Sequence, residues 1–253
     1  IAHFQNVFPL ISPSAYYACQ ANNVPVVQSL RNYRLFCLNG TFFRDGSICK
    51  ACMGKKVPWP GVVHRCYRSS LPQSATVAAM LSFHRWLKTW DKQVNLYIAL
   101  TNFSKAEFIR NGFPSQKIMV KPNYTEPQTT EDHERDRALF VGRLTDEKGA
   151  EFLLRAWPQN VTIPLKIVGK GAIAAAIAPN RSQPIEFVGK VSTTEVPFYM
   201  KKALFLIVPS LWYETFGRVI IEAYACGTPV IASRLGAMAE IVEDGKTGLL
   251  FIP

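Results

Sequence analysis

Residues 204–223, LFLIVPSLWYETFGRVIIEA, decide the fold. The first five are an apolar run without polar alternation, which is typical of a parallel strand buried on both faces, and a Pro-Ser pair ends it. A helix should begin near Gly217, because the apolar residues that follow keep a helical spacing until a Gly-Thr-Pro sequence closes it. Glu214 therefore lies in a strand-to-helix turn, and Glu222 lies one helical turn further on.

Such a junction is a site for binding a phosphorylated ligand. The amides of Phe216, Gly217 and Arg218 should point out of the helix N-terminus, where unpaired donors and the helix dipole favour a diphosphate. Glu222 is placed to accept two ribose hydroxyls, as acidic residues do in dinucleotide folds. Glu214 then faces the group that the diphosphate carries. On the two glutamates alone, partners of the helix dipole or solvated charges are the simpler interpretation.

Strands and helices alternate along the rest of the chain. In the second half, strands are expected near residues 138–142, 165–169, 185–188, 204–208 and 229–232, and helices near 148–156, 171–177, 194–203, 217–226 and 237–243. In the first half, strands are expected near residues 2–5, 25–30, 95–100 and 117–121, and helices near 12–22, 73–91 and 104–112. This alternation predicts α/β domains with parallel sheets and right-handed crossovers. The polar stretch 125–132 predicts a linker between domains 1–128 and 129–253.

Glu214-x7-Glu222 and the Gly-Thr-Pro sequence after it resemble the signature of retaining glycosyltransferases of family 4. Five more segments carry the resemblance: Phe140–Gly149, Leu165–Gly169, Ile185–Gly189, Gly236–Val242 and Asp244–Leu250. The resemblance implies a GT-B fold of two Rossmann-like domains, with the donor bound by residues 129–253. Residues 1–128 are then an incomplete acceptor-side domain with an insertion at 35–70, and the chain is expected to be truncated at both ends.

The resemblance also implies a reaction, the transfer of a sugar from a nucleotide diphosphate donor with retention of anomeric configuration. Arg143 and Lys148 would neutralise the departing diphosphate together with the amides of Phe216 and Gly217, while Glu214 would contact the donor sugar. The remaining donor-binding residues are Gly142, Arg218, Glu222 for the ribose, and Lys190 and Val191 for the base. No catalytic metal is required.

On the acceptor side, the position of a family histidine is expected at Arg31, and His3 is a second candidate with a structural role as the alternative. The expected acceptor is a glycan or a lipid-linked molecule in surface polysaccharide assembly. The alternative is a non-catalytic fragment that binds a nucleotide sugar. The donor is a UDP- or GDP-sugar in either case.

The charge of the chain is concentrated in its first half. The net charge is +11, and residues 1–128 hold 15 Lys and Arg against 4 Asp and Glu, whereas residues 129–253 hold 14 of each. This asymmetry indicates an anionic partner. An amphipathic helix over Ala78–Lys92, with Trp86 and Trp90 beside basic residues, favours an anionic membrane surface. A helix that packs its Trp residues into the domain is the alternative, and the absence of a nucleic-acid-binding motif argues against nucleic acid.

Composition sets the compartment that we expect. The chain is 48% hydrophobic and 19% charged, a globular profile. No apolar run approaches the roughly 20 residues that span a bilayer, and the first residues do not form a secretory signal. The expectation is a cytoplasmic protein that can bind peripherally to the inner face of the membrane.

Four cysteines form a pattern that the fold does not require. Cys37, Cys49, Cys52 and Cys66 fall in a Gly- and Pro-rich stretch, and the Cys-x2-Cys spacing suits tetrahedral zinc. Only one half of the usual paired Cys-x2-Cys pattern is present. Buried reduced thiols, or disulfides in an oxidising compartment, are the alternatives to a structural zinc.

Overall fold

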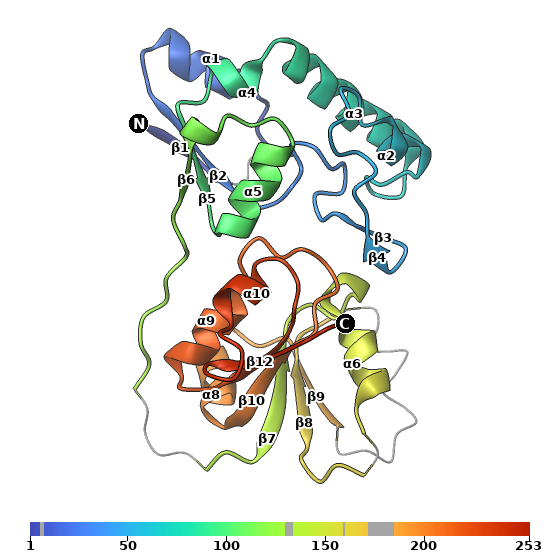
Figure 1. Ribbon diagram of the computed structural model, residues 1–253, viewed down its shortest axis with the longest axis vertical. Helices are drawn as coiled ribbons and strands as arrows, with labels where there is room; N and C mark the ends of the chain where they lie inside the picture. The colour runs from blue at the N-terminus through green and yellow to red at the C-terminus, as the bar shows by residue number, and fades with distance from the viewer. Residues whose placement is uncertain (6–7, 130–133, 159, 172–184) are drawn as a thin grey trace. The chain divides into compact units, whose positions relative to one another are not determined.

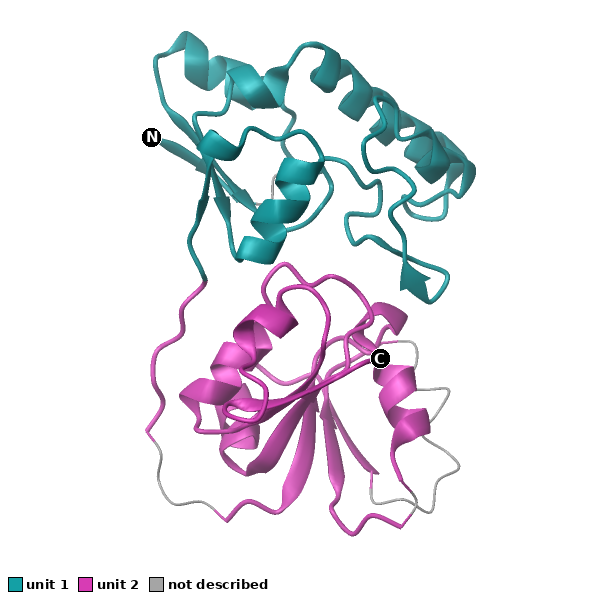
Figure 2. Cartoon of the chain, in the orientation of Figure 1, with its two compact units in different colours: residues 1–122 teal, residues 123–253 magenta. Residues whose placement is uncertain are grey.

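The chain forms two compact units in the computed structural model, residues 1–122 and residues 123–253 (Figure 2). The structure describes residues 1–5, 8–129, 134–158, 160–171 and 185–253. The units divide after Pro122, ahead of the domain boundary that the sequence predicts at residue 128. The unit division places the polar stretch 125–132 in unit 2, before the first strand of that unit.

Unit 1 has a parallel sheet of four strands in the order β1-β2-β5-β6 (Figure 1). The strands are β1 (Ala2–Phe4), β2 (Val26–Leu30), β5 (Leu96–Ala99) and β6 (Ile118–Val120). The helices are α1 (Ser14–Ala21), α3 (Leu71–Trp86), α4 (Thr89–Lys92) and α5 (Asn102–Arg110), with a 3-10 turn η1 (Ser115–Lys117) before β6. All four strands lie where the apolar pattern predicts them.

A long insertion with little regular structure lies between β2 and α3. It contains the antiparallel strands β3 (Phe43–Arg44) and β4 (Ser47–Ile48) and the short helix α2 (Trp59–Val63). An aromatic cluster packs at its start: the rings of Tyr33 and Phe42 stack with centroids 4.5 Å apart, and Phe36 contacts Phe108 of α5. The hairpin and α2 follow β2 in blue tones in Figure 1.

One predicted helix of unit 1 is wrong. Residues 73–91 do not form one helix, because α3 ends at Trp86 and α4 begins at Thr89. Lys88 between them has a left-handed backbone, with φ of 54°, which a continuous helix does not accommodate. The break separates the two tryptophans: Trp86 is 76% exposed, while Trp90 is buried with 5% of its surface exposed. The predicted amphipathic helix over Ala78–Lys92 is therefore corrected to two helices with different environments.

Unit 2 has a parallel sheet of six strands in the order β12-β11-β10-β7-β8-β9. The strands are β7 (Arg137–Val141), β8 (Leu165–Val168), β9 (Ile185–Gly189), β10 (Ala203–Val208), β11 (Val230–Ser233) and β12 (Gly248–Phe251). The helices are α6 (Ala150–Ala156), α8 (Val196–Lys201), α9 (Arg218–Ala225) and α10 (Met238–Ile241), and a 3-10 turn, η2 (Asp146–Lys148), precedes α6. Strand β12 was not predicted, and the predicted helix 171–177 falls almost wholly outside the described residues.

The sheet of unit 2 is buried on both faces. Leu139 of β7 packs with Met200 of α8 and Ile220 of α9, whereas its neighbour Phe140 packs with Leu154 of α6 on the opposite face. Side chains of a strand alternate between the faces, so both residues are buried only because helices cover both sides (Figure 1). Within the described residues, no helix has the length and apolar character that a bilayer crossing requires.

Candidate active site

The candidate site lies where the strand order of unit 2 reverses. From β7 the chain proceeds to β8 and β9 on one side, and then returns to place β10 against the other side of β7. Loops leaving β7 and β10 at such a switch point diverge and open a crevice for ligands at the carboxyl edge. Arg143 and Lys148 follow β7, and Glu214 and Gly217 follow β10. The predicted residues from both segments therefore flank one switch point.

Lys148 and Glu214 form an ion pair across this switch point. Lys148 Nζ lies 2.5 Å from Glu214 Oε1, and the two side chains are only 23% and 10% exposed. Ser210 Oγ and Trp212 Nε1 donate to the same oxygen at 2.9 and 3.0 Å. Among the described residues, these contacts all use Oε1, so the second carboxylate oxygen of Glu214 is available to a ligand.

Ser210 and Trp212 are the residues of this cluster that the motif did not identify. Lys148 Nζ also lies 5.3 Å from the centroid of the Trp212 ring, within cation–π range. In the predicted turn, Ser210 lies four residues and Trp212 two residues before Glu214, and each side chain has a hydrogen-bond donor. These two features were the signal available in the sequence. Together they fix the orientation of the carboxylate before any ligand arrives.

Glycines hold the loops at this edge in close contact. Gly149 has φ of 69°, and a Cβ built on it would lie 1.8 Å from the carbonyl oxygen of Pro209. A Cβ on Gly169 would lie 1.8 Å from the carbonyl oxygen of Gly142, a predicted donor-binding residue. The amide of Leu211 also donates to Glu147 O at 2.9 Å. The loop after β7 is thus fixed to the loop after β10 by backbone contacts.

Helix α9 begins with three backbone amides that precede its hydrogen bonds, on the buried residues Phe216 and Gly217 and the exposed Arg218. Gly217 is its N-cap with φ of 81°, and the first hydrogen bond of the helix runs from Ile220 N to Gly217 O at 2.9 Å. The amides of Phe216, Gly217 and Arg218 therefore precede the hydrogen-bonded helix, as predicted for an anion site. A Cβ on Gly217 would lie 3.1 Å from Ile220 Cδ1, so the position is also tightly packed.

The outer cations of the site are held in surface ion pairs. Arg143 lies 2.9 Å from Glu147, and Arg218 lies 2.7 Å from Glu222 on α9. The two arginines are 65% and 70% exposed, and ion pairs of this kind contribute about 0–1 kcal/mol. A ligand can therefore displace either pairing at little cost. Glu222 lies beside Arg218 rather than in contact with Glu214.

Lys190 and Val191, the residues predicted to contact the base, follow β9 at the same edge of the sheet. Val191 packs against the core cluster that contains Leu139 and Ile220. Strand β9 is two strands from β7, so Lys190 belongs to the far end of the crevice edge rather than to the Glu214 cluster.

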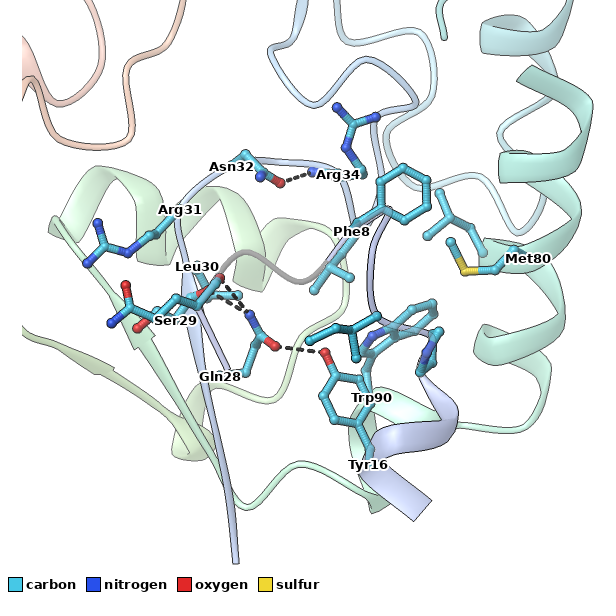
Figure 3. A pocket seen from close by; sticks show the side chains of 15 residues that line it. Phe8, Tyr16, Gln28, Ser29, Leu30, Arg31, Asn32, Arg34, Met80 and Trp90 are labelled. Atoms are coloured by element: carbon cyan, nitrogen blue, oxygen red, sulfur yellow. Dashed lines mark hydrogen bonds between the residues drawn. The ribbon is translucent and has the colours of Figure 1, made fainter. Parts of the chain in front are cut away.

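Unit 1 has a pocket beyond the carboxyl end of β2, and Arg31 lines it (Figure 3). Its wall is mostly apolar, with Phe8, Met80 and Trp90 among the lining side chains. Gln28 anchors its floor by accepting a hydrogen bond from the Tyr16 hydroxyl at 2.7 Å. The second predicted acceptor-side residue, His3, is outside this lining; its Nε2 lies 2.9 Å from Ser29 Oγ on the neighbouring strand.

The four cysteines of the insertion line one small cavity in unit 1. They carry free thiols in the structure. Within the described residues, no three His, Cys, Asp or Glu side chains are already gathered in a metal-binding arrangement.

Comparison with known proteins concerns the part of the chain that carries the candidate site. Residues 135–253 match the family model described as glycosyl transferases group 1. They include every residue of the Lys148 and Glu214 cluster. Most of unit 2 is therefore similar to glycosyl transferases of group 1.

Individual relatives share sequence with the same part of the chain or with more of it. An uncharacterized glycosyltransferase of Methanocaldococcus jannaschii is 40% identical over 116 residues, covering 44% of this chain and 32% of the relative. An uncharacterized 41.2 kDa protein in the cps region of Klebsiella pneumoniae is 33% identical over 196 residues, 67% of this chain and 54% of the relative. The chain thus spans about a third to a half of these relatives.

Solved structures show that the fold of the chain is GT-B. The crystal structure of Anabaena HepE in complex with UDP superposes with a TM-score of 0.67 at 20% identity, covering 95% of this chain and 62% of that one. This agreement confirms the predicted α/β class with Rossmann-like parallel sheets. At this identity the likeness concerns the fold, so the roles of single residues depend on the site geometry.

Proposed function

We propose that the protein transfers a sugar from a nucleotide diphosphate donor to an acceptor, with retention of anomeric configuration. The observation that carries the proposal is the Lys148–Glu214 pair at the switch point, beside the amides that begin α9. The amides and the helix dipole attract the diphosphate. Lys148 and Arg143 then offset the negative charge that develops as the diphosphate leaves, without a catalytic metal.

The other residues of the site have separate roles in this proposal. The free oxygen of Glu214 accepts hydroxyls of the donor sugar, because Oε1 is already held by three donors. Glu222 exchanges its exposed ion pair with Arg218 for the ribose hydroxyls. Gly142 belongs to the donor-binding residues, and the backbone of Lys190 and Val191 borders the base. A UDP-sugar is the first donor to test, because the structurally similar Anabaena protein was crystallised with UDP, and a GDP-sugar is the second.

The acceptor belongs to unit 1 in this proposal. Residues 1–122 hold 15 basic and 3 acidic residues, a net charge of +12, and Arg31 lines an otherwise apolar pocket. These features suit a glycan or a lipid-linked acceptor that carries a phosphate. A role in surface polysaccharide assembly is supported by the relative whose name places it in a cps region.

Calorimetric titration with UDP and GDP, followed by a panel of nucleotide-sugar donors, tests the proposal. Binding of one nucleotide and release of its diphosphate from the matching sugar donor are expected. Proton NMR of the transferred sugar should show the anomeric configuration of the donor. Binding without turnover favours the alternative, a non-catalytic protein that binds nucleotide sugars. Absence of binding to either nucleotide contradicts both.

A second proposal concerns attachment of unit 1 to an anionic membrane surface. Phe83 and Trp86 project from the end of α3 with more than half of their surfaces exposed, their ring centroids lie 6.1 Å apart, and the unit that carries them is strongly basic. Aromatic side chains next to excess positive charge favour the surface of anionic lipid. Attachment of this kind weakens with salt.

Cosedimentation with vesicles distinguishes binding through the Phe83 and Trp86 surface from nonspecific adsorption of the protein. Binding to vesicles that contain anionic lipid is expected at low salt, with little binding to neutral vesicles. Trp86→Ser should reduce it several-fold, whereas Phe198→Ser, which changes an aromatic residue 56% exposed on α8 of unit 2, should leave it unchanged. Equal binding by the wild type and the Trp86 variant contradicts the proposal.

A further inference from the structure

The insertion of unit 1 has too little regular structure to hold its own shape. Between residues 37 and 66 it has two strands of two residues and one helix of five residues. Of the seven non-glycine residues with positive φ in the described part of the chain, five fall in the short range 42–69, namely Phe42, Asp45, Arg65, Arg68 and Ser69. Such conformations persist only where the surroundings enforce them. The aromatic cluster of Tyr33, Phe36 and Phe42 packs one end of the insertion, and a cross-link or a bound group would hold the rest.

Four thiols converge on one point of this insertion. Cys37, Cys49, Cys52 and Cys66 line the same cavity, although 29 positions separate the first from the last. The backbone of α2 packs directly onto one of them, since a Cβ on Gly61 would lie 3.3 Å from Cys52 Sγ and 2.7 Å from Leu38. The chain has folded so that both ends and the middle of the insertion bring a sulphur to the same place.

The most buried sulphur is oriented by the turn that follows it. Cys37 Sγ donates to Asn39 Oδ1 at 2.9 Å. The same oxygen accepts from Thr41 N at 3.0 Å, and Asn39 Nδ2 donates to Phe43 O at 2.6 Å. Hydrogen bonds of this kind beside a metal ligand orient it.

The charge of the insertion complements a metal thiolate. Residues 37–66 hold five basic residues and one acidic residue, a net charge of +4. A zinc ion with four thiolates carries a net charge of −2, which this segment offsets.

We propose that Cys37, Cys49, Cys52 and Cys66 bind one zinc ion as a structural site that fixes the insertion of unit 1. Four thiols lose four protons as the ion binds. In the described residues the sulphurs are not yet in coordinating positions, so the proposal requires rotation about χ1 of the cysteines when the ion binds. The site is separate from the glycosyltransferase domain and does not depend on the proposed reaction.

Metal analysis of the full chain, purified without chelator, tests the proposal directly. About one zinc per chain is expected, with four thiols that react with Ellman's reagent only after a chelator has removed the metal from unfolded protein. Cys52→Ser should lower the zinc content to near zero. Cys19→Ser, which changes a half-buried thiol on α1 outside the cavity, should keep it at one equivalent.

A second measurement covers the case in which Cys52→Ser fails to fold. Cobalt exchanged into the wild-type protein should show thiolate-to-cobalt charge transfer and the strong visible bands of a tetrahedral site. Wild-type protein with well under one equivalent of zinc and freely reactive thiols overturns the proposal. Disulfides among the four cysteines, found by mass spectrometry, or iron in place of zinc would also overturn it.

Discussion

Glu214 is held by three donors on one oxygen, and this arrangement decides what its substitution should do. Glu214→Gln keeps the shape of the side chain but removes the charge that pairs with Lys148. If this carboxylate contacts the reacting donor, the transfer rate should fall by roughly 100-fold or more, as for loss of one preorganised polar group in an active site. The loss should appear in both kcat and kcat/KM.

A surface glutamate in the same unit provides the control for this substitution. Glu151→Gln removes a charge from an exposed pair with Arg155 on α6 and should leave the rate within about twofold, because exposed pairs contribute little. An unchanged kcat in Glu214→Gln would remove this residue from the mechanism.

Gly149 gives a second prediction at the scale of one residue. Gly149→Ala places a methyl group 1.8 Å from Pro209 O, so the loops after β7 and β10 must separate, and the free energy of unfolding should fall by about 3 kcal/mol or more. Gly189→Ala is the matched control, since Gly189 also has positive φ but open space around it, and it should lose only about 1 kcal/mol. Urea unfolding measures both. If the two variants lose the same free energy of unfolding, the positive φ of the glycine, and not the contact with Pro209, accounts for the loss.

The motif residues were easier to predict than their neighbours. The apolar run and the helical spacing after it predicted that Glu214 lies in a turn, that the helix begins near Gly217 and that Glu222 lies on that helix, and the structure has this arrangement. The contacts of Ser210 and Trp212 depend on how the turn folds back on itself, which spacing does not encode. The 1.8 Å approach at Gly149 likewise depends on a strand sixty residues later.

Among the elements, the buried strands were predicted well because burial on both faces produces continuous apolar runs. Strand β12 has only four residues, and Leu249 is exposed, so its sequence resembles a loop. The break between α3 and α4 was missed for a different reason. Apolar residues continue across it at helical spacing, and neither a glycine nor a proline marks the left-handed residue Lys88.

The break between α3 and α4 makes a prediction about glycine. Lys88→Gly should leave the free energy of unfolding unchanged or raise it by up to about 1 kcal/mol, because glycine adopts φ of 54° without steric cost. Ala79→Gly, at an exposed position inside α3, should lower it by about 1 kcal/mol. Thermal unfolding of the two variants compares them. A loss of that size in Lys88→Gly would indicate one continuous helix.

At the scale of the whole molecule, charge divides between the units as the sequence indicates. Unit 1 carries +12 and unit 2, with 14 basic and 15 acidic residues, carries −1. The match to the glycosyltransferase family is confined to residues 135–253, so the basic unit is the part whose chemistry the family model does not describe. Acceptor, membrane and zinc proposals all concern this unit, and the donor proposal concerns the other.

This division predicts which amides each ligand protects. A ligand that binds only the folded state stabilises it by about 2.7 kcal/mol at 100 times its dissociation constant. UDP at that concentration should therefore slow the hydrogen exchange of the most protected amides in residues 123–253 by about 100-fold. Removing zinc with a chelator should speed exchange in residues 37–66. Mass spectrometry of peptides separates the two effects. UDP protection confined to residues 1–122 would contradict the assignment of the donor site to unit 2.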